Sequence, residues 1–201
     1  MSSPCSGTRD RRVSPDPASE RAAHPRIAEL LELLDESRAA VTMAVARVPE
    51  EVRARRAGEG HWTVGEVLDH LHRVDAGFAR RLQKVVAEAK ERGTPRETET
   101  SSVLDRLDRT KVTDRSRRLE APEIVRPTAE ASAAEALAAL GESRAAVRAG
   151  LLAANGLALG SVVLPHNVLG PLDMYQWTLF LAWHEERHAA QIREIADAVR
   201  G

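Results

Sequence analysis

Residues 177–192 read Trp-Thr-Leu-Phe-Leu-Ala-Trp-His-Glu-Glu-Arg-His-Ala-Ala-Gln-Ile, and they give the strongest indication of the fold class of the chain. Its first seven residues are almost continuously apolar, and a helix that is apolar nearly all round must be surrounded by other elements. His184 and His188 stand one helical turn apart and project from the same side of that helix. Both fall near the middle of an apolar stripe that runs from Trp177 to Ile195. The stretch therefore predicts a central helix with two inward-facing imidazoles.

Three further segments have apolar residues at helical spacing, so the chain reads as four helices in all. The predicted helices are Pro25 to Val48, a second that starts at the Thr63-Val64-Gly65-Glu66 capping box and stops at Gly93-Thr94-Pro95, an Ala-rich third from Thr128 to Ala154, and Leu172 to Val199. Residues 93 to 130 are charged and predict a long connection with one short helix. The sequence thus predicts an all-α chain: a four-helix bundle over residues 25–201, with a long connection between helices 2 and 3 and a disordered tail at residues 1–24.

Composition limits the classes of protein that fit. The chain has 201 residues, of which 43% are apolar, 29% charged and only 3% aromatic, which favours one helical domain. The formal net charge of −1 offers no field for nucleic acid or an anionic membrane, and no apolar run is long enough for a membrane span. Cys5 is the sole cysteine, so no internal disulfide exists. The N-terminal segment lacks an apolar signal core, and we expect a cytoplasmic protein.

The histidine pair favours a metal site. Two buried imidazoles without partners cost free energy, because each ring has a donor and an acceptor to satisfy. A metal ion satisfies one nitrogen of each ring, and a third ligand from another helix would leave coordination positions open for chemistry. His70 and His72 lie on opposite flanks of the apolar stripe of the second helix. Periodicity leaves both open as the third ligand.

The string His184-Glu185-Glu186-Arg187-His188 also matches the H-E-x-x-H pattern of zinc proteases. We discount a protease, because the chain ends 13 residues after His188 and no strand-bearing context is predicted. Glu185 has two equal interpretations: a proton acceptor beside the metal, hence a catalytic residue, or a solvated carboxylate on the helix surface.

Several other features receive a structural interpretation. We interpret the three tryptophans as core residues rather than as the lining of a substrate pocket. We interpret His61 and His166 as plain surface histidines. We interpret the arginines at 106 to 118 as part of a solvated connection rather than as a binding site for an anion. The segment Glu36-Ser37-Arg38-Ala39-Ala40-Val41 recurs at residues 142–147, which hints at a duplicated helix pair.

The segment Trp62-Thr63-Val64-Gly65-Glu66-Val67-Leu68-Asp69-His70-Leu71 resembles the second-helix signature of the DinB-like superfamily. The C-terminal signature of that superfamily is similar to residues 165–172 followed by residues 184–192. The likeness covers about residues 25 to 200. One departure is His166-Asn167, where the family often has His-Pro. The 93–130 insertion has no counterpart that can be placed.

The resemblance implies a metal-binding four-helix bundle with a three-histidine site, and it assigns the ligands to His70, His184 and His188. The family includes YfiT-type metal-dependent hydrolases and transferases that use thiols such as bacillithiol or mycothiol. We therefore expect a divalent metal cofactor, most simply zinc with nickel or iron as alternatives, and a low-molecular-weight thiol as co-substrate. The leading hypothesis is a thiol S-transferase acting on a small-molecule substrate. A hydrolase using an activated water and a non-catalytic metal- or ligand-binding bundle remain alternatives, and the Ala-rich helix suits a homodimer.

Overall fold

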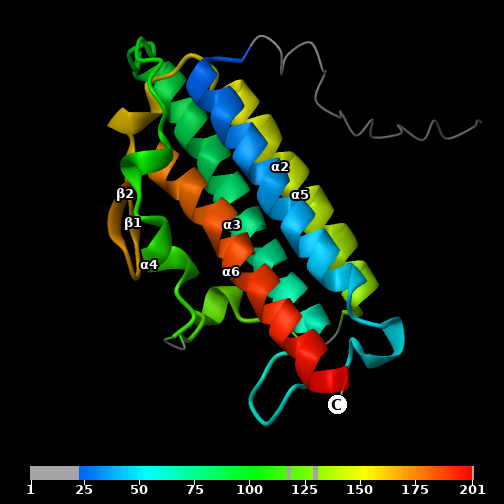
Figure 1. Cartoon of the computed structure of the whole chain (residues 1–201). Coiled ribbons are helices and arrows are strands. Elements are labelled where there is room, and N and C mark those ends of the chain that lie inside the picture. Colours follow the sequence, from blue (N-terminus) through cyan, green and yellow to red (C-terminus); the bar gives the residue numbers. More distant parts are fainter. Residues whose placement is uncertain (1–22, 117–118, 129–130, 201) are drawn as a thin grey trace, which may run out of the picture.

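The computed structural model describes residues 23–116, 119–128 and 131–200, so most of the predicted tail at 1–24 lies outside the described residues. Four long helices run side by side through the described chain (Figure 1). They are α2 (Pro25–Ala46), α3 (Val64–Glu91), α5 (Ala133–Ala153) and α6 (Met174–Arg200). The chain is mostly helical, which confirms the all-α prediction in this coarser form.

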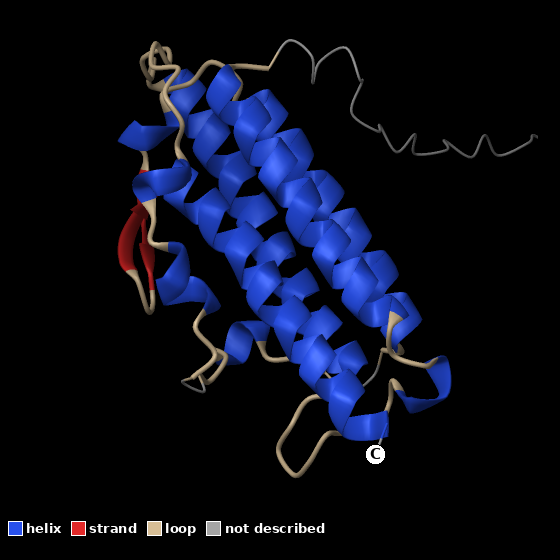
Figure 2. Ribbon diagram, in the orientation of Figure 1, coloured by secondary structure: helices blue, strands red, loops and turns tan. Residues whose placement is uncertain are grey.

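The remaining elements are short. They are η1 (Glu50–Val52), η2 (Leu104–Arg106), α4 (Arg109–Thr113), η3 (Glu123–Val125), η4 (Leu159–Ser161), β1 (Val163–His166) and β2 (Gly170–Asp173). The two strands pair antiparallel, with Val163 opposite Asp173 and His166 opposite Gly170, and they form a small hairpin beside the helices (Figure 2). Within the described residues, no helix combines the length and apolar character that a membrane span requires.

Local sequence explains where α3 and α5 begin. Thr63 caps α3 through the predicted capping box, in which the Thr63 side chain accepts from the Glu66 N–H and the Glu66 side chain accepts from the Thr63 N–H. The predicted start of the third helix at Thr128 is wrong. An equivalent capping box, Ser132 with Glu135, starts α5 at Ala133. Thr128 instead belongs to the connection before α5, and its N–H donates to the Asp69 carboxylate on α3 at 2.7 Å.

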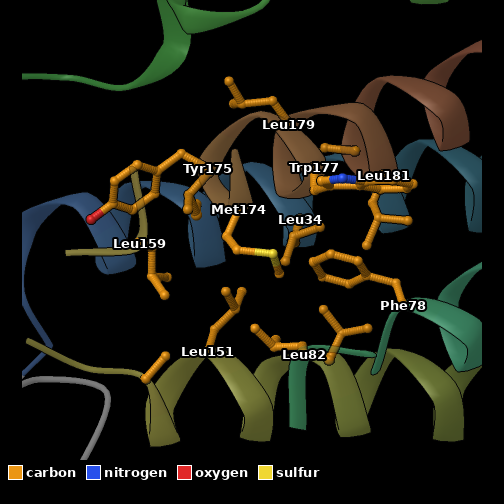
Figure 3. Packing of buried hydrophobic residues seen from close by; sticks show 14 of the residues in the cluster. Leu34, Phe78, Leu82, Leu151, Leu159, Met174, Tyr175, Trp177, Leu179 and Leu181 are labelled. Carbon is orange, nitrogen blue, oxygen red and sulfur yellow. The ribbon is translucent and has the colours of Figure 1, made fainter. Parts of the chain in front are cut away.

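Small residues let α3 and α5 lie close together. A Cβ added at Gly150 would lie 2.7 Å from the Leu82 Cδ2 atom, and one added at Gly65 would lie 3.0 Å from the Ala131 carbonyl oxygen. Side chains from all four long helices then meet in a buried apolar cluster, including Leu34, Phe78, Leu82, Leu151 and Met174 (Figure 3).

The long connection, here called the strap (residues 97–116 and 119–128), runs beside α6 and is fixed to α6 and to β2 by ion pairs. Three of its arginines bind acidic residues: Arg106 with Asp173, Arg109 with Glu186, and Arg115 with Glu194. Val103 and Val112 of the strap are buried in the apolar cluster. These three arginines therefore form ion pairs while partly facing solvent, Arg117 and Arg118 lie outside the described residues, and the strap packs on the fold through its two buried valines.

Candidate metal centre

His70 on α3 and His184 and His188 on α6 bring their ring nitrogens together. The Nε2 atom of His184 lies 3.3 Å from that of His70 and 3.1 Å from that of His188. One ligand atom from each residue fits within 4.8 Å of the others, which suits a shared metal ion. His72 instead donates its Nδ1 hydrogen to the Ala139 carbonyl oxygen at 2.9 Å and links α3 to α5. The structure thus brings His70, and not His72, to the pair on α6, and its role as a metal ligand stays a prediction.

Two of the three rings are oriented by outer partners. The Nδ1 atom of His70 donates to the Val125 carbonyl oxygen of the strap at 2.7 Å, and that of His188 donates to Gln191 Oε1 at 2.7 Å. A neutral imidazole that donates from Nδ1 keeps a free lone pair on Nε2. Such partners fix the tautomer and the orientation of metal-ligating histidines.

The converging lone pairs make the donor set fit a cation. The Nε2 lone pairs of His70 and His188 both face His184, whose single ring hydrogen can satisfy only one of them. The Nδ1 atom of His184 is buried and has no hydrogen-bond partner among the described residues. A divalent ion would accept all three Nε2 lone pairs at once. The three residues therefore fit the metal that the resemblance implies.

Electrostatics keep the three rings neutral, as metal binding requires. Burial lowers the pKa of His70 below its ordinary value of 6.5. Burial, reinforced by the neighbouring imidazoles, lowers the pKa of both His184 and His188 well below that value. The cluster thus presents unprotonated nitrogens at neutral pH.

Aromatic rings surround the three imidazoles. The Trp62 ring centroid lies 5.0 Å from that of His70 and 6.3 Å from that of His188, in a stacked arrangement with the latter. Phe180 stacks on His184 with ring centroids 5.1 Å apart. These contacts place Trp62 and Phe180 against the imidazoles, so Trp62 lies beside the site rather than in the apolar core alone.

His166, interpreted from the sequence as a plain surface histidine, is half-buried in the hairpin. Its Nδ1 atom accepts hydrogen bonds from the Val168 and Leu169 N–H groups, each at 3.1 Å. Its ring lies against Phe180 and Trp177, with centroids 4.4 and 4.9 Å apart. The surface interpretation is therefore wrong. Through His166, the hairpin packs against the aromatic rings of Phe180 and Trp177.

Glu185 lies in the interior of the helices rather than on the surface. Its carboxylate accepts a hydrogen bond from Ser37 Oγ at 2.8 Å and pairs with Arg38 at 2.6 Å and Arg144 at 3.0 Å. The interpretation as a solvated carboxylate is wrong. Its catalytic role stays a prediction, because the groups that its oxygens contact are these three rather than the imidazoles.

Sequence reasoning missed the charged partners in the interior, although a signal was present. Arg38 and Arg144 occupy the same position in the segment that recurs at 36–41 and 142–147. Both arginines pair with Glu185. Both also pair with Asp75, whose carboxylate lies 3.4 Å from Arg38 and 2.9 Å from Arg144. A repeated Ser-Arg on two otherwise apolar helix faces was the observable clue. The outer partner Val125 left no such clue, because it acts through its backbone.

Comparison with known proteins agrees with this arrangement. The family model described as the DinB superfamily matches residues 33–192, a range that holds all three histidines. Similarity extends to the uncharacterized protein YuaE of Bacillus subtilis (strain 168), which is 24% identical over 170 residues, or 84% of this chain and 98% of that protein. No solved structure matches the chain. With its family model matched over most of its length, this chain belongs to the DinB superfamily.

Proposed function

We propose that this protein is a divalent-metal-dependent enzyme that activates a low-molecular-weight thiol for transfer to a small electrophilic substrate, and that its four long helices form the four-helix bundle of its family. One observation carries the proposal: three neutral imidazoles from two helices, of which His70 and His188 are buried and His184 is partly exposed, bring their Nε2 atoms together. Three histidine ligands leave at least one coordination position for a reactant, as in catalytic zinc sites.

A divalent ion, when bound, supplies Lewis acidity that lowers the pKa of a coordinated thiol or water and so provides a nucleophile at neutral pH. The protein's own residues prepare the site. The Val125 carbonyl and the Gln191 side chain hold two of the rings in the tautomer that leaves Nε2 free. Trp62 and Phe180 cover the ring faces and limit access of bulk water. Zinc is the simplest ion for this donor set, and nickel and iron also suit imidazole ligands.

The resemblance to a family that includes transferases of low-molecular-weight thiols favours thiol transfer over hydrolysis. A hydrolase is the second candidate, since the same donor set can activate water. A non-catalytic metal-binding protein is the third. The proposed partners are a small-molecule substrate and a second copy of the chain, and light scattering of the purified protein tests the latter.

Metal analysis of the purified full chain is the first test. We expect close to one equivalent of a divalent metal, lost in His184→Ala and retained in His72→Ala. Bacillithiol, mycothiol and glutathione are then offered with a bimane electrophile, with and without metal. Thiol conjugation that needs the metal supports the proposal. Metal content below roughly a tenth of an equivalent, with stability unchanged by a chelator, would overturn it.

Metal binding without consumption of any thiol would reject the transferase version and leave hydrolysis of model esters and amides to be assayed. Glu185→Gln tests whether that residue is catalytic or only balances the charges of its two arginine partners. A proton acceptor would change the pH profile of the reaction, whereas a carboxylate that only neutralises Arg38 and Arg144 would change the free energy of unfolding.

A further inference from the structure

The metal centre depends on a segment remote in sequence. Val125, in η3 of the strap, provides the carbonyl oxygen that accepts from His70 Nδ1 at 2.7 Å, across 55 positions of the chain. A single backbone acceptor thus sets the tautomer of the one ligand that α3 supplies. Whatever holds Val125 in place therefore controls the orientation of His70.

Asp69, the residue before His70, holds the end of the strap. Its Oδ2 atom accepts hydrogen bonds from the Thr128 N–H at 2.7 Å and from the Thr128 hydroxyl at 3.3 Å. Arg73, one turn further along α3, donates to the same oxygen at 3.0 Å and to the Thr128 hydroxyl at 3.0 Å. Asp69 is buried, with 8% of its surface exposed. The Asp69 carboxylate thus binds the strap, although Asp69 is next to His70 in the sequence.

The link between the two contacts is short and stiff. Only Arg126 and Pro127 separate Val125 from Thr128. Arg126 is extended, with φ −66° and ψ 133°, the conformation that a following proline enforces. The ring of Pro127 fixes its own φ. Holding Thr128 therefore fixes the position of the Val125 carbonyl.

We propose that Asp69 is a positioning residue of the metal centre, which anchors Thr128 and thereby holds the Val125 carbonyl against His70 Nδ1. This inference rests on the proposed function in one respect, namely that His70 binds a metal. The strap that joins helices α3 and α5 is then a working part of the site. Asp69 itself stays outside the coordination shell, because the ligand cluster found among the described residues consists of the three histidines.

The test compares variants of the full chain for zinc affinity, measured by competition with a chromogenic chelator. Asp69→Ala removes the anchor, and Asp69→Asn keeps a side-chain oxygen that can accept the Thr128 N–H. Loss of an outer-shell partner typically lowers metal affinity by about 10–100-fold. We expect a loss on the order of tenfold for Asp69→Ala and a smaller loss for Asp69→Asn. Glu97→Ala is the matched control, because Glu97 anchors the opposite end of the strap to Arg26 and Tyr175.

A second measurement needs no metal. Long-range ¹H–¹⁵N spectra of histidine-labelled apoprotein report which ring nitrogen carries the hydrogen, and His70→Gln assigns the His70 signals. In the unmodified protein His70 should be the Nδ1–H tautomer, and in Asp69→Ala it should become a mixture. Glu97→Ala should retain the Nδ1–H form.

Three outcomes contradict the inference: zinc affinity of Asp69→Ala within twofold of the unmodified protein, an unchanged His70 tautomer, or an equal loss of affinity in Glu97→Ala. The last outcome would mean that loosening the strap at either end lowers zinc affinity equally. If the protein binds no metal at all, the proposed function fails, while the tautomer measurement still decides whether Asp69 positions His70. Urea unfolding of each variant identifies any that fail to fold.

Discussion

Arg38 and Arg144 stand at the same position in a repeated segment of sequence, and both bind the carboxylate of Glu185. They approach it from α2 and α5, and both also reach Asp75 on α3. The two serines that precede them match as well, since Ser37 and Ser143 each donate to the carbonyl oxygen three residues earlier. Two positive and two negative groups thus balance inside an otherwise apolar interior. The repeated Ser-Arg residues thus join one polar cluster, and the duplicated helix pair stays a prediction.

Removing one member of this cluster should be costly. Arg144→Leu leaves Glu185 and Asp75 with only Arg38, and an uncompensated buried charge typically costs about 3–5 kcal/mol. We expect a lower free energy of unfolding by that amount in urea titrations. Arg148→Leu, four residues along α5, is the control, because its partner Asp35 is exposed and such pairs contribute about 0–1 kcal/mol. Equal effects of the two substitutions would argue against a special role for the cluster.

The choice between His70 and His72 is open to direct measurement. His70→Gln should remove zinc binding, because its Nε2 atom is one of the three that converge. His72→Gln should leave zinc affinity unchanged and lower only the free energy of unfolding, by about 0.5–1.5 kcal/mol for the lost bond to the Ala139 carbonyl. Isothermal titration with zinc and urea unfolding check both. Loss of zinc binding in His72→Gln would contradict the geometry.

The sequence predicted the elements that depend on local patterns. The helical spacing around His184 and His188 and the capping box at Thr63 are confirmed, because periodicity and caps are properties of a few neighbouring residues. Periodicity could not choose between His70 and His72, since both flank the stripe. That choice needs the neighbouring helix, and only the resemblance supplied it before the fold was known.

Contacts between segments that lie far apart in the sequence could not be predicted from local patterns. The bond from His70 to Val125 uses a backbone carbonyl, which every residue type provides, so no pattern marks it. Glu185 sits in a string of charged residues and looks exposed until its arginine partners on α2 and α5 are placed around it. The start of α5 could have been predicted, because Ser132-Ala133-Ala134-Glu135 is itself a capping-box sequence.

Alanine substitutions at two glycines of α5 should change the stability of the fold in opposite directions. A Cβ at Gly150 would lie 2.7 Å from Leu82 Cδ2, and Leu82 is fully buried, so Gly150→Ala should destabilise by about 1–3 kcal/mol through overpacking. Gly141 has no neighbouring atom within 4 Å of such a Cβ. Gly141→Ala should stabilise by about 0.4–1 kcal/mol, because it restricts the unfolded chain and favours helix. Thermal unfolding distinguishes them, and a stabilising Gly150→Ala would show that the two helices can separate without cost.

Glu97 should make the fold sensitive to acid. Burial alone would raise the pKa of Glu97, but hydrogen bonds from Tyr175 and the Glu99 N–H, together with the charge of Arg26, outweigh it and lower the pKa from 4.5 to about 2. A carboxyl group with a depressed pKa in the folded state stabilises fully above its unfolded pKa and loses that contribution as the pH falls toward the folded value. Glu97→Gln should therefore be less stable than the unmodified protein at pH 7, and the difference should shrink between pH 4.5 and 2. Urea unfolding across that range measures it. A difference that stays constant with pH would show that the ionised carboxylate is not what ties the strap to Tyr175.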